Sequence, residues 1–419
     1  MLEIYKYIDG VAMSILIKGA IVVTQDEGRS VLKGDVYIEE ERIAEIAGRI
    51  NVGADYKIDA NGKILMPGLI NTHTHVGMSS LRGYVDEMSL DEFLEKTFAF
   101  DKGREDAHLY KDSVVSIREM LQTGTTSFLD LYYGEEVIAR AAAKLGSRAF
   151  LAWAILDKEY TTQKGVPLEN AERFIRKFIG RNPLLNPEVG LQGVYVCSAE
   201  TMRKAKELAE RYDRIITMHL AESKREVEES REKRGKDPIR YLEEIGFLGR
   251  RLIAAHAVHA DNADIALLAG NGVTVSHNPV SNMKLGNGIA PIYEMLRAGV
   301  NITLGTDSAA SNNNLDMFQS MKFASLLQKG ANGNPGIATA QQVLDFATVN
   351  AAKALGMQDK IGSIKEGMLA DVVLLNPSPN GLPLSRANAV ANIVYAMEGL
   401  NVEMSIVNGK IVVDKTIEK

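Results

Sequence analysis

The chain has 419 residues, of which 46% are hydrophobic and 24% are charged, and its formal net charge is −6 at pH 7. This balance is typical of a soluble globular protein with ample material for a core. A negative chain without a basic patch argues against nucleic acid and membrane surfaces as partners. The single cysteine, Cys197, excludes an internal disulfide and fits a cytoplasmic protein, and its apolar neighbours predict a small buried side chain rather than a nucleophile.

Both ends of the chain are rich in short segments of alternating valine and isoleucine, which predict β-strands. Residues 13–66 and 368–419 are expected to fold together as one small β domain, with antiparallel strands in its first part. Residues 1–12 precede a strand-like segment that begins at Met13, so we expect an extension there, with either Met1 or Met13 as the start. The N-terminus lacks the pattern of a signal peptide, and no apolar run reaches the about 20 residues of a membrane helix.

The middle of the chain, residues 67–367, alternates apolar segments with amphipathic ones. Near-continuous apolar strands separated by helices are typical of a parallel sheet covered by helices on its outer face. Eight such segments predict an α/β fold, specifically a (β/α)8 barrel of the TIM type. The expected strands are LMPGLINTHTH, GTTSFLDLYY, RAFLAWAIL, VGLQGVYV, RIITMHLAE, LIAAHAVH, VTVSHNPV and NITLGTD. The mixed-charge run Lys224–Arg240 predicts a solvated helix face.

The chain has seven histidines, and six of them lie at or near the end of an expected strand: His73, His75, His219, His256, His259 and His277. The seventh, His108, lies in a charged, helix-like stretch and is expected at the surface. In a barrel of parallel strands, the carboxyl ends of the strands meet at one rim, where active sites are built. The clustering of histidines at these ends therefore predicts a functional site on that rim.

Four of these strand-end residues predict a mononuclear metal site. His73 and His75 are two residues apart on one strand, so their side chains project from the same face toward one ion. His219 follows another strand, and Asp307 ends an apolar strand where its carboxylate needs a partner that offsets desolvation. Three imidazoles and one carboxylate favour Zn²⁺, with Fe²⁺ as the alternative, over Mg²⁺ or Ca²⁺. For each histidine taken singly, the alternative is a hydrogen-bonded core residue.

The same rim carries candidates for catalysis. A metal there lowers the pKa of a bound water, and a proton must then be carried to the leaving group. Glu222, three residues after a candidate ligand, is the expected general acid and base; its alternative is a surface glutamate at the start of a helix. His256 is expected to polarise or orient the attacked group. Asp307 could also hold the water and accept its proton, whereas His259 and His277 are expected to be supporting or structural residues.

Five segments resemble the amidohydrolase superfamily, and within it the group of 5′-methylthioadenosine/S-adenosylhomocysteine deaminases, close to chlorohydrolases and guanine or cytosine deaminases. The segments are PGLINTHTH, HLAES, AAHAVH, SHNPVSNMKLGNGIAP and LGTDSAASNNNLDMF. The resemblance runs from about Met13 to Val413. It implies a distorted (β/α)8 barrel with a small β-sandwich built from both chain ends, and often a homo-oligomer. It also implies the roles that strand-end placement predicts. The metal ligands are His73, His75, His219 and Asp307, the proton shuttle is Glu222, and the orienting histidine is His256.

The resemblance implies one metal, because the fourth expected strand has no lysine of the kind that bridges two metals in binuclear relatives. It also implies a substrate pocket, and here the chain departs from the family. Arg82 keeps the family's Arg-Gly pair, but Phe93 stands in place of a tryptophan and Asp101 is the nearest candidate for a glutamate that grips ribose hydroxyls. Trp153 stands where an arginine is common, either as a stacking platform for a flat ring or as a core residue.

Two further departures lie in the same pocket. Gln192 begins a run, Gln192–Tyr195, that replaces a proline-histidine-serine-proline turn, and a second pocket arginine is missing, with Lys164 nearby. These losses disfavour a substrate with a charged homocysteine tail. Gln192 and Glu222 are expected to contact the substrate with the residues named above.

The first functional hypothesis is metal-dependent hydrolytic deamination of an aminated heterocycle, such as a purine base or an adenosine-type nucleoside. It depends on Glu222, because an amine must be protonated to depart. The alternatives are dechlorination or hydrolysis of an amide or another C–N bond at the same site. A non-catalytic scaffold is a third hypothesis, which predicts eroded ligands, and no ligand position is eroded here.

Overall fold

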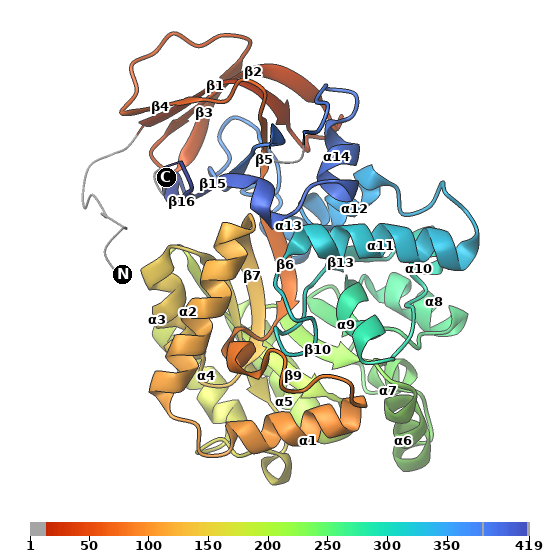
Figure 1. Ribbon diagram of the computed structural model, residues 1–419. Helices are drawn as coiled ribbons and strands as arrows, with labels where there is room; N and C mark the ends of the chain where they lie inside the picture. The colour runs from red at the N-terminus through yellow and green to blue at the C-terminus, as the bar shows by residue number, and fades with distance from the viewer. Residues whose placement is uncertain (1–13, 379–380, 417–419) are drawn as a thin grey trace.

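A computed structural model describes residues 14–378 and 381–416 (Figure 1). The expected extension at residues 1–12 and the candidate start at Met13 lie outside the described residues. None of the described helices is long and apolar enough to cross a membrane.

The middle of the chain forms the predicted barrel, and all eight expected strand segments are strands. They lie side by side in chain order and are parallel throughout. Nearly every residue of these strands is buried, which explains their near-continuous apolar sequences. The strands are β6 (Leu69–Thr74), β7 (Thr125–Tyr132), β8 (Arg148–Ile155), β9 (Leu185–Gly193), β10 (Ile216–Leu220), β11 (Leu252–His256), β12 (Thr274–His277) and β13 (Asn301–Leu304).

The first and last barrel strands, β6 and β13, meet through a few specific contacts. The backbone N–H of Asp307 donates to the carbonyl oxygen of His73 over 3.0 Å, and the hydroxyls of Thr72 and Thr303 lie 2.8 Å apart. Gly305 passes so close that an added Cβ would lie 2.8 Å from the Cβ of His73. Only glycine fits this approach, and it brings the chain segment of Asp307 directly beside the His73–His75 segment.

The two chain ends form one β domain, as predicted. Its strands make a single eight-stranded sheet, in which β1 pairs parallel with β4 and β5 and the other pairs are antiparallel. The expectation of antiparallel pairing throughout the first part was therefore wrong for two pairs, whose connections run through other strands. The strands are β1 (Ser14–Val23), β2 (Val31–Glu39), β3 (Arg42–Ala47), β4 (Tyr56–Asp59), β5 (Ile64–Pro67), β14 (Val372–Leu375), β15 (Val402–Val407) and β16 (Lys410–Asp414).

Helices surround the barrel, and α1 lies at the end of the molecule away from the β domain (Figure 1). This end is the one toward which the barrel strands run, so α1 and its neighbouring loops cover the catalytic rim of such a fold. The helices are α1 (Leu90–Asp101), α2 (Asp106–Gln122), α3 (Glu135–Leu145), α4 (Pro167–Phe178), α5 (Ala199–Tyr212), α6 (Lys224–Arg234), α7 (Pro238–Glu244), α8 (Asn262–Asn271), α9 (Pro279–Lys284), α10 (Ile292–Ala298), α11 (Met317–Asn332), α12 (Ala340–Phe346), α13 (Val349–Ala354) and α14 (Ala389–Tyr395).

Candidate metal centre and active site

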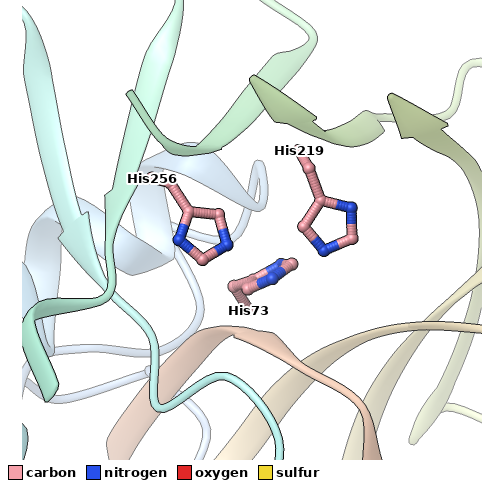
Figure 2. Close-up of side chains that lie close together, drawn as sticks. All are labelled: His73, His219 and His256. Atoms are coloured by element: carbon pink, nitrogen blue, oxygen red, sulfur yellow. The ribbon is translucent and has the colours of Figure 1, made fainter. Parts of the chain in front are cut away.

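The structure brings the four predicted ligands together at the carboxyl ends of three strands. His73 and His75 come from the end of β6, His219 from β10, and Asp307 follows β13. His256, the last residue of β11, joins them, and Figure 2 shows the imidazoles of His73, His219 and His256 pointing toward one another. Two overlapping groups, His73–His219–His256 and His73–His75–Asp307, each offer three ligand atoms within 4.8 Å of one another.

Hydrogen bonds to backbone carbonyls set the tautomers of two of the rings. The Nδ1 of His75 lies 2.6 Å from the carbonyl oxygen of Leu131, and the Nδ1 of His219 lies 2.6 Å from that of Gln192. Because a carbonyl oxygen only accepts, each Nδ1 carries the proton and the neutral ring keeps its lone pair on Nε2. The two Nε2 atoms face each other at 3.2 Å. Two facing lone pairs repel, and a cation between them turns both into ligands.

His73 is the most enclosed of the rings. Its side chain is completely buried, and neither ring nitrogen has a hydrogen-bond partner among the described residues. An unpartnered imidazole in a barrel interior is costly unless it binds something else. Its Nε2 lies 3.6 Å from Oδ1 of Asp307, which also lies 3.2 Å from Nε2 of His75. These atoms fit a metal ion with nitrogen and oxygen ligands.

The other carboxylate oxygen of Asp307 is held by the protein itself. The hydroxyls of Ser281 and Ser311 donate to Oδ2 over 2.6 and 2.8 Å. This pairing leaves Oδ1 directed at the histidines. Supporting hydrogen bonds of this kind orient a metal-binding carboxylate and keep it ionised.

The protonation states of the rings agree with metal binding. Burial holds the pKa of His73 well below its ordinary value and lowers the pKa of His219 to about 3, and the neighbouring imidazoles add to both effects. Burial alone would raise the pKa of Asp307, but His75 and His73 hold it well below its ordinary value. Burial likewise would lower the pKa of His75, and the carboxylate of Asp307 raises it. The cluster therefore combines two imidazoles whose pKa values are lowered, those of His73 and His219, with a carboxylate that attracts positive charge.

The backbone at this rim is strained at three strand ends. Ala221, His256 and Asp307 have positive φ angles of 48°, 75° and 61°. Residues with a Cβ rarely adopt this conformation, and the surrounding structure must hold them in it. All three lie beside the imidazole cluster, so the strain is concentrated where the strands turn their side chains inward.

Glu222, the predicted proton shuttle, lies inside the site rather than on the surface. It is buried just after β10, and its Oε2 lies 3.7 Å from Nε2 of His256. The amide of Asn287 donates to its Oε1 over 2.9 Å. Burial raises the pKa of Glu222, and the nearby His256 partly offsets this effect. A carboxyl group with a raised pKa holds a proton more readily than an ordinary glutamate does, which suits a general acid and base.

The orientation of His256 is also fixed by a neighbour. Its Nδ1 lies 2.7 Å from the amide oxygen of Asn282, whereas its buried Nε2 has no partner among the described residues. The Nδ1 therefore carries the proton, and Nε2 points with a free lone pair toward Glu222 and the metal cluster.

The backbone turn that carries Glu222 is held by Glu226, which sequence reasoning missed. The carboxylate of Glu226 accepts hydrogen bonds from the N–H groups of Ala221 and Glu222 over 3.0 and 2.8 Å. Glu226 belongs to the run Lys224–Arg240, whose other charged residues in α6 are mostly exposed as predicted. The signal was the spacing Ser223-x-x-Glu226, which is typical of a helix N-terminus whose glutamate reaches back to the preceding backbone.

A cavity opens beside the cluster, and three of the residues expected to contact substrate line it in addition to Glu222: Phe93, Asp101 and Gln192. The carbonyl of Gln192 is also the one that holds His219. Sequence reasoning missed several polar and aromatic residues of the cavity wall, which lie at the end of β7 or in the segments that follow β7, β8, β9 and β13. These are Tyr132, Tyr133, Gln163, Tyr195 and Ser308.

Asp101 is held at the end of α1 by a short chain of hydrogen bonds. The hydroxyl of Tyr132 donates to its two carboxylate oxygens over 2.8 and 3.0 Å, and Nη1 of Arg104 lies 3.5 Å away. Burial raises the pKa of Asp101, and these partners counteract the rise. The carboxylate keeps further lone pairs for the hydroxyls of a ligand.

Two residues expected to contact substrate, Arg82 and Trp153, are not among those that line the cavity. Arg82 pairs with the carboxylate of Glu119 instead. The Trp153 ring is buried and packs at 46° against Phe174, an environment that favours the expected alternative of a core residue over that of a stacking platform. Its position on β8, whose strand residues are all buried, is the physical reason.

The other histidines and the cysteine that the sequence analysis considered do not take part in the cluster. His277 is completely buried, and burial lowers its pKa to about 3; His259 is half-buried. His108 is exposed on α2. Cys197 is buried and burial raises the pKa of its thiol to about 12, so it is not a nucleophile at neutral pH.

Comparison with known proteins agrees with this geometry. The model of the Amidohydrolase family matches residues 64–412, which is most of the chain. The chain belongs to the amidohydrolase family. Two relatives of this amidohydrolase are each 41% identical to it. One is a 5-methylthioadenosine/S-adenosylhomocysteine deaminase of Thermococcus sibiricus, aligned over 96% of this chain and 94% of the relative. The other is a 5′-deoxyadenosine deaminase of Methanosarcina acetivorans, aligned over 96% and 93%.

A solved structure is similar over the same extent. An adenosine deaminase from Xanthomonas campestris with bound zinc superimposes with a TM-score of 0.91 at 29% identity, and the match covers 96% of this amidohydrolase and 93% of that chain. The fold of this amidohydrolase is thus that of the Xanthomonas enzyme.

Proposed function

We propose that this amidohydrolase is a zinc-dependent deaminase that removes the amino group from the purine ring of an adenosine-type nucleoside. The observation that carries the proposal is the position of Glu222 beside His256 and the imidazole cluster, in a protein whose relatives carry the names of adenosine-type deaminases. Assembly as a homo-oligomer and a cytoplasmic location stay predictions from the sequence.

The metal would be held by His73, His75, His219 and Asp307. Their three unprotonated nitrogens and one ionised oxygen favour zinc, and the zinc of the Xanthomonas deaminase supports this choice. A zinc ion in such a site supplies Lewis acidity, which lowers the pKa of water. His256 would remain outside the ligand set, with its Nε2 free to accept a hydrogen bond from the attacking water or to orient the ring.

Glu222 moves the proton that the reaction requires. Water adds its oxygen to the ring carbon that bears the amino group, the C–N bond breaks, and the amino group leaves as ammonia. The leaving nitrogen must gain a proton, and the water must lose one. The carboxyl group of Glu222, held by Asn287 and with its pKa raised by burial, takes the proton from water and passes it to the nitrogen.

The cavity wall would position the nucleoside over this site. Phe93 offers a flat apolar surface for the purine, and Asp101, held by Tyr132, offers lone pairs to the hydroxyls of the sugar. Gln192 would contact the ring beside His219 while its carbonyl holds that histidine in place.

The experiment is ammonia release by the zinc-loaded protein from a panel of aminated heterocycles: adenosine, 5′-deoxyadenosine, adenine, guanine and cytosine. We expect release from the adenosine-type nucleosides above all. No ammonia from any member, combined with turnover of a chlorinated or cyclic-amide substrate, would refute deamination and favour one of the other hydrolytic reactions.

A further inference from the structure

We propose that the cavity selects adenine nucleosides whose 5′ substituent is uncharged and largely apolar, and that it rejects those with a carboxylate or phosphate there. This inference rests on the proposed function and adds the substrate class within it. The names of the relatives mention substrates with and without a charged 5′ tail. 5′-Deoxyadenosine has an uncharged 5′ group, whereas the tail of S-adenosylhomocysteine carries an ammonium and a carboxylate.

The charges around the cavity are of one sign. Within the described part of the chain, no lysine or arginine lines it, whereas three carboxylates do: Asp101, Glu222 and Asp307. Asp307 would face the metal and Glu222 the leaving group, which leaves Asp101 for the sugar. The rest of the wall consists of apolar side chains, hydroxyls and amides, and none of these neutralises an anion.

Gln163, a neutral residue of the wall near β8, is already hydrogen-bonded to the protein. The indole Nε1 of Trp153 donates to Oε1 of Gln163 over 2.8 Å, and Nε2 of Gln163 donates to the carbonyl oxygen of Ala154 over 3.0 Å. Both ends of the Gln163 amide are therefore engaged with the protein. A carboxylate arriving there would find no charged donor to replace its lost water.

Three cations that lie close to wall residues in sequence, Arg104, Lys158 and Lys164, are either paired with carboxylates or exposed outside the cavity. Arg104 lies behind Asp101, with its guanidinium paired to Asp101 and Asp112 and a side chain only 3% exposed. Lys158 and Lys164 flank the loop residues of the wall in sequence, but both are exposed and neither lines the cavity. If either lysine turned into the cavity, its ammonium group would supply the cation that the wall lacks, and the inference would fail.

Burying a carboxylate without a cation is costly, and the neighbouring acidic groups add repulsion. An apolar methyl or methylthio group gains from the same wall, because leucine and phenylalanine side chains such as Leu94, Phe98 and Leu156 line it. We therefore expect the kcat/KM for S-adenosylhomocysteine to lie about 100-fold or more below that for 5′-methylthioadenosine.

The test compares kcat/KM of the full-length, zinc-loaded protein for four compounds: 5′-deoxyadenosine, 5′-methylthioadenosine, S-adenosylhomocysteine and adenosine 5′-monophosphate. Rapid deamination of the first two with weak turnover of the last two supports the inference. Turnover of S-adenosylhomocysteine or the monophosphate within tenfold of 5′-methylthioadenosine overturns it. No turnover of any of the four is a different failure, since it refutes the proposed function itself.

Two variants with a matched control locate the cause. Gln163→Arg brings a guanidinium to the neutral wall and should raise the ratio of S-adenosylhomocysteine to 5′-methylthioadenosine turnover at least tenfold, whereas Gln163→Met should not. Lys164→Ala should leave the ratio unchanged, and a loss of S-adenosylhomocysteine turnover in this variant would show that the lysine supplies a cation after all. The wild-type comparison decides the proposal even if Gln163→Arg fails to fold.

Discussion

Two clusters of buried charged and polar side chains lie at opposite ends of the barrel strands, and they differ in how their atoms are satisfied. At the amino end of β8, Arg148 is 1% exposed and pairs with Asp371 through two hydrogen bonds of 2.7 and 3.0 Å. Its Nη1 donates to the carbonyl of Pro183, and the N–H of Asn408 donates to Asp371. This cluster ties the barrel to the β domain with its own partners.

At the carboxyl end, the rings of His73 and His256 keep buried nitrogens without partners in the described part of the chain, and the lone pairs of two further histidines face each other. Three residues beside them have strained backbone angles. A cluster that is complete within the protein stabilises the fold, whereas one that lacks partners is built to receive them from outside. Mutations in the Arg148 cluster should therefore lower mainly the stability of the fold. Mutations in the histidine cluster should reduce mainly metal binding and activity.

The largest effect is expected for His73→Asn. We expect the wild-type chain to bind one zinc ion and the variant to lose both the metal and deamination, because the most enclosed candidate ligand is removed. Metal content of the dialysed protein and ammonia release are the measurements. The metal-free variant should be destabilised less than the Arg148 variant below, since neither ring nitrogen of His73 bonds to the described protein. Full zinc content in the variant would remove His73 from the ligand set.

Glu222→Gln separates proton transfer from metal binding within the same cluster. The amide keeps the shape of the side chain but cannot shuttle a proton, so kcat should fall about 10²- to 10⁴-fold while zinc content stays at the wild-type level. Steady-state kinetics measures the fall in kcat, and metal analysis measures the zinc content. Asn287→Ala, which removes the hydrogen bond to Glu222, should reduce kcat less. Activity retained in Glu222→Gln would exclude this residue from the mechanism.

Arg148→Met tests the opposite end. It leaves the carboxylate of Asp371 buried with its main partner gone, so the free energy of unfolding should fall by about 3–5 kcal/mol, whereas zinc content per folded chain should not change. Denaturant unfolding of the metal-free protein measures the loss. The double variant Arg148→Met/Asp371→Leu removes both charges and should be more stable than the single one. Equal instability of the two would show that packing, rather than the unpaired charge, causes the loss.

The same contrast explains how much could be predicted from the sequence. The eight strands were predictable because strands buried on both faces are continuous apolar runs, and the rim followed from polar residues that end those runs. His73, His75, His219 and Asp307 could be placed together for this reason alone. The parallel pairing of β1 with β4 and β5 was missed, since pairing direction depends on the path of the chain and not on local alternation.

The pocket wall was harder to predict, because several of its residues come from the segments that follow the strands, which have no periodicity. Trp153 has the sequence environment of any buried strand residue, so its partner, Gln163 ten residues later, could not be foreseen. Glu226 was hidden in a run of surface charges and is distinguished only by its spacing from Ser223. Loop contacts of this kind depend on three-dimensional proximity, which only the fold supplies.

A third buried charge, Glu188 on β9, is an intermediate case that sharpens the comparison. Its Oε2 accepts the N–H of Ile215 over 2.8 Å, but the nearest guanidinium, that of Arg214, stays 3.8 Å away. Burial raises the pKa of Glu188 to about 8, and Arg214 offsets only part of the rise.

Because its pKa in the folded chain lies above that in the unfolded chain, the stability that protonated Glu188 contributes is complete below about pH 4.5 and is lost as the pH rises toward 8. Glu188→Gln cannot ionise and keeps an oxygen for Ile215, so its stability relative to wild type should increase by about 3 kcal/mol between pH 5 and pH 8. Urea unfolding of both proteins at the two pH values measures this difference, and Glu207→Gln, at an exposed position of α5, should show no such change. A pH-independent difference for Glu188→Gln would mean that Arg214 pairs with the carboxylate in solution, and Glu188 would then belong with the completely satisfied Arg148 cluster.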